Sequence, residues 1–326
     1  MTRFLLKRLV NMIPLVIGIT FLSFLVMSLA PGNFLSNLQM NPSISPEVIR
    51  QMEAQFGLDQ PLMLRYVKWL WAVLHLNLGI SLAYRVSVAS LIGSRALNTI
   101  ILSLSSLVFA WVIAIPIGII VAVRQNSIWD RVLSFLAFLG MSVPNFFFAF
   151  LLMYMALRTG WFPVGGTFSV DYASLAPLAK VADRINHLIL PVIVLGTAGM
   201  ASLMRLMRSQ ILEIKNSEFV RTARAKGLSE RVVIYKHVLR NALNPFVTMA
   251  GYALADLLGG AALVESVMNL QGLGLLLLDA VRSLDVYLVM GSVLMGAVLL
   301  LGGNLLADIA LVMVDPRVDF SSGESQ

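Results

Sequence analysis

The chain has 326 residues, of which 58% are hydrophobic and only 13% are charged, and its mean hydropathy is +0.85. A water-soluble domain of this size carries about a quarter charged residues and a disordered chain is much less apolar, so both classes are excluded. The absence of cysteine excludes disulfides, thiolate metal sites and a cysteine nucleophile. The three histidines, His75, His187 and His237, are too scattered to predict a metal centre. The composition therefore predicts an integral membrane protein.

Six stretches that are almost free of charged residues are long enough to cross a bilayer. A helix rises about 1.5 Å per residue, and about 20 apolar residues cross the hydrocarbon core. The stretches are 9–30, 96–123, 132–157, 188–204, 241–264 and 286–307, and the fourth is completed by the amphipathic extension 206–212. These lengths predict an all-α protein with six transmembrane helices.

The basic residues predict the orientation of these helices, because Lys and Arg are enriched in cytoplasmic segments. With the N-terminus inside, fifteen of the 24 Lys and Arg residues fall on the cytoplasmic side, against nine on the longer outer loops. Nine of the fifteen lie between Arg205 and Arg240. Because an even number of spans returns the chain to the side where it began, we expect both termini in the cytoplasm (N-in/C-in).

The long segment after the first span is expected to contain two helices. Ser45 suits an N-cap, Pro46 the first helical position and Glu47 the first turn, and Gly57 provides a stop. A second segment, 66–78, contains two tryptophans and has the composition of an interfacial helix. This outer segment is therefore predicted to be ordered.

The span pattern predicts how the chain is organised. Residues 1–95 are expected to form the first transmembrane helix and a long external loop, and residues 96–320 a five-helix core. Residues 321–326 are expected to form a flexible tail. The core is interrupted by the basic cytoplasmic segment 213–240, which contains most of the functional information.

Within that segment, a short amphipathic helix is predicted. Ser217 suits its N-cap, Glu218 is favourable near the positive end of the helix dipole, and Gly227 is the expected left-handed terminator with Leu228 folded back behind it. The apolar face is expected to hold Phe219, Val220 and Ala223, and the basic face Arg221, Arg224 and Lys226.

A second helix, starting at Ser229-Glu230, is expected to continue into the fifth span, so that the short helix is tethered at both ends. Such a helix can transmit force from a soluble partner to the membrane helices. It can equally rest on anionic lipid, which requires the same basic and amphipathic pattern. Binding to DNA is excluded, because a helix tethered at both ends is poorly placed to enter a groove.

Residues 218–228, Glu-Phe-Val-Arg-Thr-Ala-Arg-Ala-Lys-Gly-Leu, and 240–245, Arg-Asn-Ala-Leu-Asn-Pro, resemble the coupling loop of ABC-importer permeases. The resemblance is to the dipeptide, oligopeptide and nickel branch, in its first, B-type permease subunit. It continues over nearly the whole chain through separated matches in the same order, at 8–9, 56–62, 78–81, 142–146, 259–261, 272–274 and 315–317. Several matches in order are far more specific than any one of them.

This resemblance implies the type I ABC-importer permease fold and a location in the bacterial inner membrane. It implies a permease subunit that moves peptides inward by alternating access. A nickel chelate, glutathione or a glycoside is the alternative solute. An ion-driven secondary transporter is a less favoured alternative, because such proteins usually show internal repeats and an ionisable pair near the midplane.

The implied partners are a second homologous permease, two cytoplasmic ATP-binding subunits, an external solute-binding protein and the lipid bilayer, with no nucleic acid. The chain lacks the G-x-x-x-x-G-K-[ST] phosphate loop, so ATP and Mg²⁺ are expected on the partner ATPases and no cofactor or metal on this chain. We therefore expect a subunit that is not itself an enzyme.

The resemblance also indicates which residues contact the ATPase. The expected coupling residues are Glu218, Phe219, Arg221, Ala223, Arg224, Ala225 and Gly227. The wider permease motif has Glu-Ala-Ala where this chain has Arg221-Thr222-Ala223, and Glu218, one helical turn earlier, is expected to substitute for the missing glutamate. The small Ala223 and Ala225 would allow close approach of the partner.

Three residues are candidates for the translocation path. Asp256 lies within the fifth predicted span, where a carboxylate is costly and is expected to face the protein interior. Pro144 bisects the third predicted span and predicts a kink there, with Asn145 beside it. For each residue the alternative is a packing role, through a hydrogen bond to a neighbouring helix for Asp256 and a static kink for Pro144.

Overall fold

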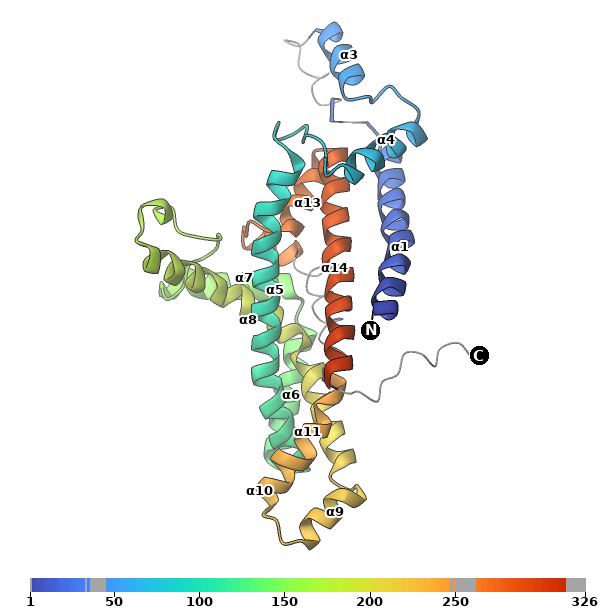
Figure 1. Cartoon of the computed structure of the whole chain (residues 1–326). Helices are drawn as coiled ribbons and strands as arrows, with labels where there is room; N and C mark the ends of the chain where they lie inside the picture. The colour runs from blue at the N-terminus through green and yellow to red at the C-terminus, as the bar shows by residue number, and fades with distance from the viewer. Residues whose placement is uncertain (1, 33, 36–44, 247–248, 250–261, 315–326) are drawn as a thin grey trace. The chain divides into compact units, whose positions relative to one another are not determined.

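The computed structural model describes residues 2–32, 34–35, 45–246, 249 and 262–314, which are almost entirely helical (Figure 1). Its long helices are α1 (Thr2–Leu29), α5 (Val88–Val123), α8 (Pro177–Ile214) and α14 (Val286–Val314), and its shorter ones include α3 (Pro46–Gln55), α4 (Leu62–Leu74), α6 (Ile128–Ser142), α7 (Asn145–Thr159) and α13 (Leu273–Arg282). The chain forms two compact units, the first made of 1–99 and 271–301 and the second of 100–270 and 302–326.

Four helices in the described residues are long and apolar enough to cross a membrane. They are Arg8–Leu29, Val88–Val123, Pro177–Ile214 and Val286–Leu306, and they coincide with the first, second, fourth and sixth predicted spans. The bent pair α6 and α7 brings the number to five if it is counted as one span. Most of the predicted fifth span, 241–264, lies outside the described residues.

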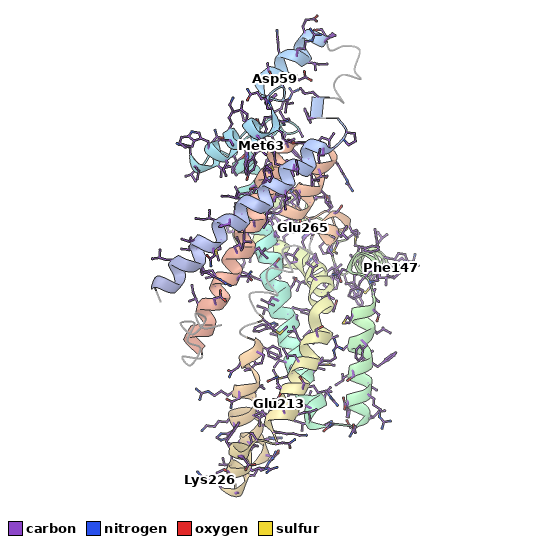
Figure 2. The ribbon with its side chains drawn as sticks, turned by 90° about the vertical axis from the view of Figure 1, so that its right-hand side faces the viewer. Asp59, Met63, Phe147, Glu213, Lys226 and Glu265 are labelled. Carbon is purple, nitrogen blue, oxygen red and sulfur yellow. The ribbon has the colours of Figure 1, made fainter. Side chains whose placement is uncertain are left out.

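The kink predicted at Pro144 is confirmed, but it is a complete break. Helices α6 and α7 meet at 101°, not as one gently bent span. Val143, which precedes the proline, adopts an extended conformation at φ −90°, ψ 123°, because proline disfavours helical dihedrals in the residue before it. Figure 2 views α7 nearly end-on, with Phe147 on its surface and α6 running away from it.

In the first unit, α4 is attached to α1 by an aromatic cluster. The Tyr66 hydroxyl lies 3.0 Å from the Thr20 hydroxyl and donates to the Ile17 carbonyl at 3.1 Å, and the Phe21 and Tyr66 rings meet edge to face. Trp69 is only 4% exposed, whereas Trp71, on the opposite side of α4, is 66% exposed. The segment predicted to be interfacial is therefore a helix with one face buried in the core and the other open.

Other parts of the first unit are fastened by buried hydrogen bonds. The carboxylate of Asp285, fully buried, accepts from the Ser81 hydroxyl at 2.6 Å and the Ala83 amide at 3.0 Å. It also accepts from the Leu288 amide at 3.1 Å, which caps the start of α14. The predicted helix start at Ser45 is confirmed, because its side chain accepts from the Val48 amide.

In the second unit, α5 and α8 pack at very close range. A Cβ added to Gly118 of α5 would lie 2.6 Å from Cβ of Met207 and 2.9 Å from the Met204 carbonyl oxygen, so only glycine fits. The core around this contact contains the fully or nearly fully buried residues Val121, Ala122, Met207, Ile211, Val233 and Phe246. This contact positions the end of α8, from which the candidate site begins.

Candidate functional site

The candidate site is the helical segment that follows α8. It consists of α9 (Glu218–Ala225), α10 (Glu230–Val232), the π-helical segment η2 (Val233–Val238) and α11 (Leu239–Ala242). Within the second unit, α9 lies beyond the end of α8 (Figure 1), and Figure 2 shows Lys226 at the tip of this region, farther out than Glu213. The two helices predicted from the sequence are confirmed, with a π-helical segment inside the second.

The predicted start of α9 at Glu218 is also confirmed, although its cap differs. Ser217 has the extended dihedrals of an N-cap residue, and its carbonyl accepts from the Val220 and Arg221 amides at 3.1 Å. Its hydroxyl, however, donates to the Ile214 carbonyl at 2.7 Å. The side chain of Ser217 therefore closes the end of α8 and does not cap α9.

Gly227 ends α9 as predicted. Its φ of +77° is left-handed, its amide donates to the Arg224 carbonyl at 2.9 Å, and the Leu228 amide donates to the Ala223 carbonyl at 3.4 Å. These two bonds form a Schellman motif, which satisfies carbonyls at the end of a helix. The space around Gly227 is open, so the backbone conformation alone favours glycine here.

Two of the three residues predicted for the apolar face of α9 are buried. Val220 and Ala223 are buried in the same hydrophobic cluster as Val233 and Val238 of η2, as expected for residues three apart on one face. Phe219 is 48% exposed. At about 100° per residue, Phe219 lies about 40° from Ala223 and 100° from Val220, so it stands at the exposed edge of the buried face.

Arg224 fastens α9 to both of its neighbours. Its guanidinium donates to the Glu230 carboxylate at 2.8 and 3.1 Å and to the Lys215 carbonyl at 3.2 Å. The hydrogen bond from Arg224 lowers the pKa of Glu230, and the same bond raises the pKa of Arg224. A bidentate arginine–carboxylate pair is geometrically specific, so these contacts hold α9 in one orientation.

Glu218 and Arg221 form a second ion pair, at 2.9 Å, but its side chains are 85% and 66% exposed. Exposed pairs contribute little to stability. Phe219 is also exposed, at 48%. We call these three residues the α9 contact face.

A fastening that the sequence reasoning missed joins α6 to α8. The buried carboxylate of Asp130 accepts from the Arg208 guanidinium at 3.1 Å and from the Asn126 amide at 2.9 Å. Ser127 caps α6 through the Asp130 amide. The signal was present as Ser127-x-x-Asp130 before an apolar run, which is the pattern of a capping box.

The candidate path residues are not brought together with α9. Pro144 and Asn145 lie at the far end of α6 from Asp130, about 20 Å away by the rise of a helix. Asp256 lies outside the described residues. Glu265, an acidic residue that the sequence analysis did not single out, is fully buried in the helical residues 262–267 of the second unit (Figure 2).

Two family models match the chain over most of its length. The model described as "Binding-protein-dependent transport system inner membrane component" matches residues 114–320, and that described as "Binding-prot-dependent transport system membrane comp, N-term" matches residues 1–100. The two matches therefore cover both units of the structure.

Similar curated proteins come from several bacteria. The chain is 39% identical over 324 residues to the oligopeptide transport system permease protein AppB of Bacillus subtilis, covering 98% of this chain and 100% of AppB. It is 36% identical over 335 residues to the dipeptide transport system permease protein DppB of Escherichia coli K12, covering 98% of this chain and 99% of DppB.

A solved structure has a similar fold. A chain of the MetNI methionine ABC transporter, in an inward-facing conformation, aligns with a TM-score of 0.54 and 18% sequence identity. The alignment covers 70% of this chain and 97% of that chain. At this identity the similarity concerns the fold.

Proposed function

Because the chain belongs to the family of binding-protein-dependent transport system inner membrane components, we propose that it forms part of an ATP-driven importer of peptides. It is the multi-pass, non-catalytic permease component of such a system. Peptides are proposed as the solute because AppB and DppB, which align over nearly their whole length, are named for oligopeptide and dipeptide transport.

The proposed assembly contains a second homologous permease, two cytoplasmic ATP-binding subunits that hold ATP and Mg²⁺, and an external solute-binding protein. Family membership supports the binding protein and the transport complex. In this assembly the permease supplies the path through the membrane, and the ATP-binding subunits supply the energy.

The proposed topology has six spans with both termini in the cytoplasm. The four long helices and the α6–α7 pair support five of these spans. Because the chain has no cysteine, single cysteines at Lys226 and Asp59, both exposed, can report their side of the membrane. A membrane-impermeant maleimide should label Asp59→Cys from outside and Lys226→Cys only from inside; the reverse pattern would invert the topology.

We propose that α9 is the element that an ATP-binding subunit grips. The observation that carries this proposal is that the residues of this one short helix differ in their surroundings. Val220 and Ala223 are buried, and Arg224 binds Lys215 and Glu230 on either side of the helix. The residues of the α9 contact face are exposed. Closure of the ATP-binding subunits would move α9 and the attached helices, converting an inward-open path to an outward-open one.

The seven predicted coupling residues then take different roles. Glu218, Phe219 and Arg221 would touch the partner, and the exposed, small Ala225 would permit close approach. Ala223 is buried, so it would act through packing. Arg224 and Gly227 would maintain the shape of the segment.

The test uses the reconstituted transporter and two variants that keep α9 folded. Phe219→Ala removes an exposed ring, and the double exchange Glu218→Arg with Arg221→Glu keeps the ion pair but reverses its pattern. Each should lower the affinity of the ATP-binding subunit for the permease about tenfold, equivalent to about 1.4 kcal/mol. Each should also lower uptake while ATP hydrolysis continues. Phe150→Ala, which removes a similarly exposed ring from α7, is the control. Normal uptake in both α9 variants would contradict the proposal.

The path role of Asp256, Pro144 and Asn145 is also proposed. An ionisable residue within a span usually faces a protein interior or a water-filled path, which supports Asp256 as the first to test. Asp256→Leu should reduce uptake without preventing assembly. Unchanged uptake by the assembled variant would assign Asp256 to helix packing.

A further inference from the structure

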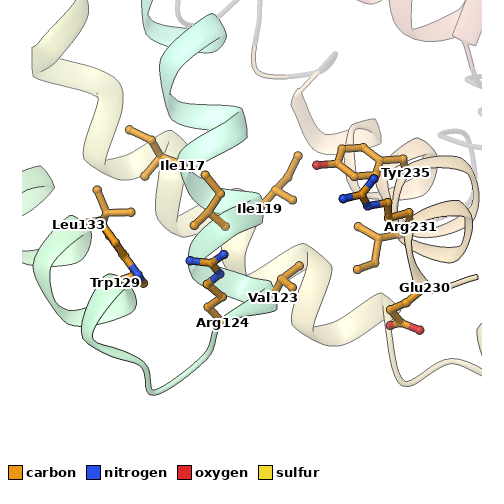
Figure 3. Close-up of a pocket in the computed structure, with 11 residues that line it drawn as sticks. Ile117, Ile119, Val123, Arg124, Trp129, Leu133, Glu230, Arg231 and Tyr235 are labelled. Carbon is orange, nitrogen blue, oxygen red and sulfur yellow. The ribbon is translucent and has the colours of Figure 1, made fainter.

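A groove of about 670 Å³ lies in the second unit beside the candidate site (Figure 3). Three elements form its walls: the last two turns of α5, the start of α6, and the α10–η2 helix. Ile117, Ile120 and Val123 line the α5 wall, which is entirely apolar over this length. The groove can therefore hold a hydrocarbon group.

Two guanidinium groups border the apolar wall. Arg124 follows the end of α5 and Arg231 belongs to α10, and both point toward the space between the walls (Figure 3). Among the described residues, neither arginine forms an ion pair. The one acid that lines the groove, Glu230, is already held by Arg224 at 2.8 and 3.1 Å. The rim therefore carries positive charge that the described residues do not neutralise.

The position of the groove matches the edge of a membrane. Helix α5 is apolar enough to span a bilayer up to Val123, and the next helix, α6, begins at Ile128 after a short turn. Trp129, about half exposed on the groove, is a residue type enriched at the membrane–water boundary. With α5 as a membrane span, the groove would run from the hydrocarbon region, at Ile117, to the aqueous boundary, at Arg124.

We infer that this groove is a binding site for one anionic phospholipid of the cytoplasmic leaflet. An acyl chain would lie on the α5 wall, and the phosphate would lie between Arg124 and Arg231. Basic pockets between helices on the cytoplasmic side suit anionic headgroups, and apolar walls suit acyl chains. The site goes beyond the transport function and relies on the proposed topology only for the choice of leaflet.

Other occupants fit these observations less well. An apolar helix of another subunit would bury two guanidinium groups without a carboxylate, which is strongly unfavourable. A free phosphate would leave the wall of Ile117, Ile120 and Val123 uncovered. A zwitterionic phospholipid would fill the wall but bring no net negative charge to the rim.

The site would also act on the coupling segment. Glu230 lines the α10 wall of the groove, and its carboxylate also accepts the hydrogen bond from Arg224 of α9. A lipid that bridges α5 and α10 would therefore stiffen the base of α9. We expect an anionic bilayer to improve the coupling of ATP hydrolysis to uptake.

The experiment compares lipid retention by the purified, assembled transporter. Native mass spectrometry after exchange into phosphatidylglycerol or phosphatidylcholine counts bound phospholipids per permease. The double variant Arg124→Gln/Arg231→Gln removes both rim charges. Because each basic residue near an anionic lipid surface contributes about fivefold, this variant should retain phosphatidylglycerol roughly 30-fold less. The control Arg131→Gln/Lys236→Gln removes the same charge from neighbouring residues that do not line the groove.

A second variant tests the apolar wall without changing charge. Ile120→Trp fills the groove from a half-exposed position, so it should displace the lipid while the core stays intact. Equal retention of both lipids by the wild type, or full retention by both groove variants, would overturn the inference. So would cross-linking of Ile120→Cys to another subunit or to residues 247–261. Lipid retention is measured without transport, so its failure is distinct from a failure of the proposed function, which appears in uptake.

Discussion

The α4 region of the first unit and the α9 region of the second solve the same problem in different ways. Each holds a short helix against neighbouring segments of its own unit. Helix α4 is held by buried aromatic side chains and by neutral hydrogen bonds to Thr20 and Ile17. Helix α9 is held by two small buried residues and by the charged contacts of Arg224.

The difference indicates how firmly each helix is fixed. Buried apolar contacts are strong and insensitive to salt, whereas exposed ion pairs are weak and screened by it. We therefore expect α4 to remain fixed when the surroundings change and α9 to be able to move with a partner. The proposed coupling role of α9 requires such mobility.

The largest effect is expected where α4 is buried. Trp69→Ala removes a nearly fully buried indole and should lower the free energy of unfolding by about 3–5 kcal/mol. Trp71→Ala, two residues away but 66% exposed, is the matched control and should change it little. Equilibrium unfolding in mixed micelles, at low and high salt, measures both. Equal effects of the two variants would show that α4 is not held by its buried face.

A smaller effect is expected at the end of α9. Gly227→Ala places a side chain in open space but at φ +77°. The left-handed backbone alone should therefore lower the stability of the end of α9 by about 1–2 kcal/mol. Gly199→Ala is the control, because its surroundings are also open and its backbone is helical; it should be neutral or stabilising. Hydrogen exchange of the Gly227 and Leu228 amides should rise only in the first variant. Unchanged exchange in Gly227→Ala would show that the left-handed conformation of Gly227 does not determine the stability of the end of α9.

The smallest effect is expected at the Arg224–Glu230 pair. Because the side chains of this pair are 39% and 57% exposed, Arg224→Gln should lower the free energy of local unfolding of α9 by only about 0.5–1 kcal/mol. The loss should be smaller at high salt. Arg221→Gln, which breaks the more exposed pair with Glu218, is the control and should cost less still.

The same pair predicts a pH dependence. Since Arg224 lowers the pKa of Glu230 below its ordinary value of 4.5, the stabilisation is fully present above that value. It should be lost as the pH falls through the lower pKa of the folded state. Hydrogen exchange of α9 amides measures this loss, and Glu230→Gln should abolish the pH dependence. A wild-type α9 that loosened with rising pH would contradict the assignment.

The sequence predicted local structure well where short-range rules decide it. The start of α3, the break at Pro144 and the left-handed Gly227 follow from a cap, a proline and a glycine, which act within a few residues. The family was equally accessible, because it depends on ordered motifs. These features need no knowledge of distant contacts.

Features that depend on distant contacts were not accessible. Nothing in the sequence pairs Asp130 with Arg208 or Ser81 with Asp285, because each pair is brought together by helix packing. The angle of 101° at Pro144 could not be derived either, because proline predicts a break but not its direction. The exposure of Phe219 could not be derived either, because it depends on which neighbouring helices cover the edge of the apolar face of α9.

The bonds of Arg224 have a mechanical consequence. By binding the Lys215 carbonyl on one side and the Glu230 carboxylate on the other, one side chain closes residues 215–230 into a ring. Under the proposed function, a displacement of α9 would therefore reach the end of α8 and the start of α10 together. Without these bonds, the connecting residues on either side of α9 would take up part of that displacement. ATP would then be hydrolysed without uptake.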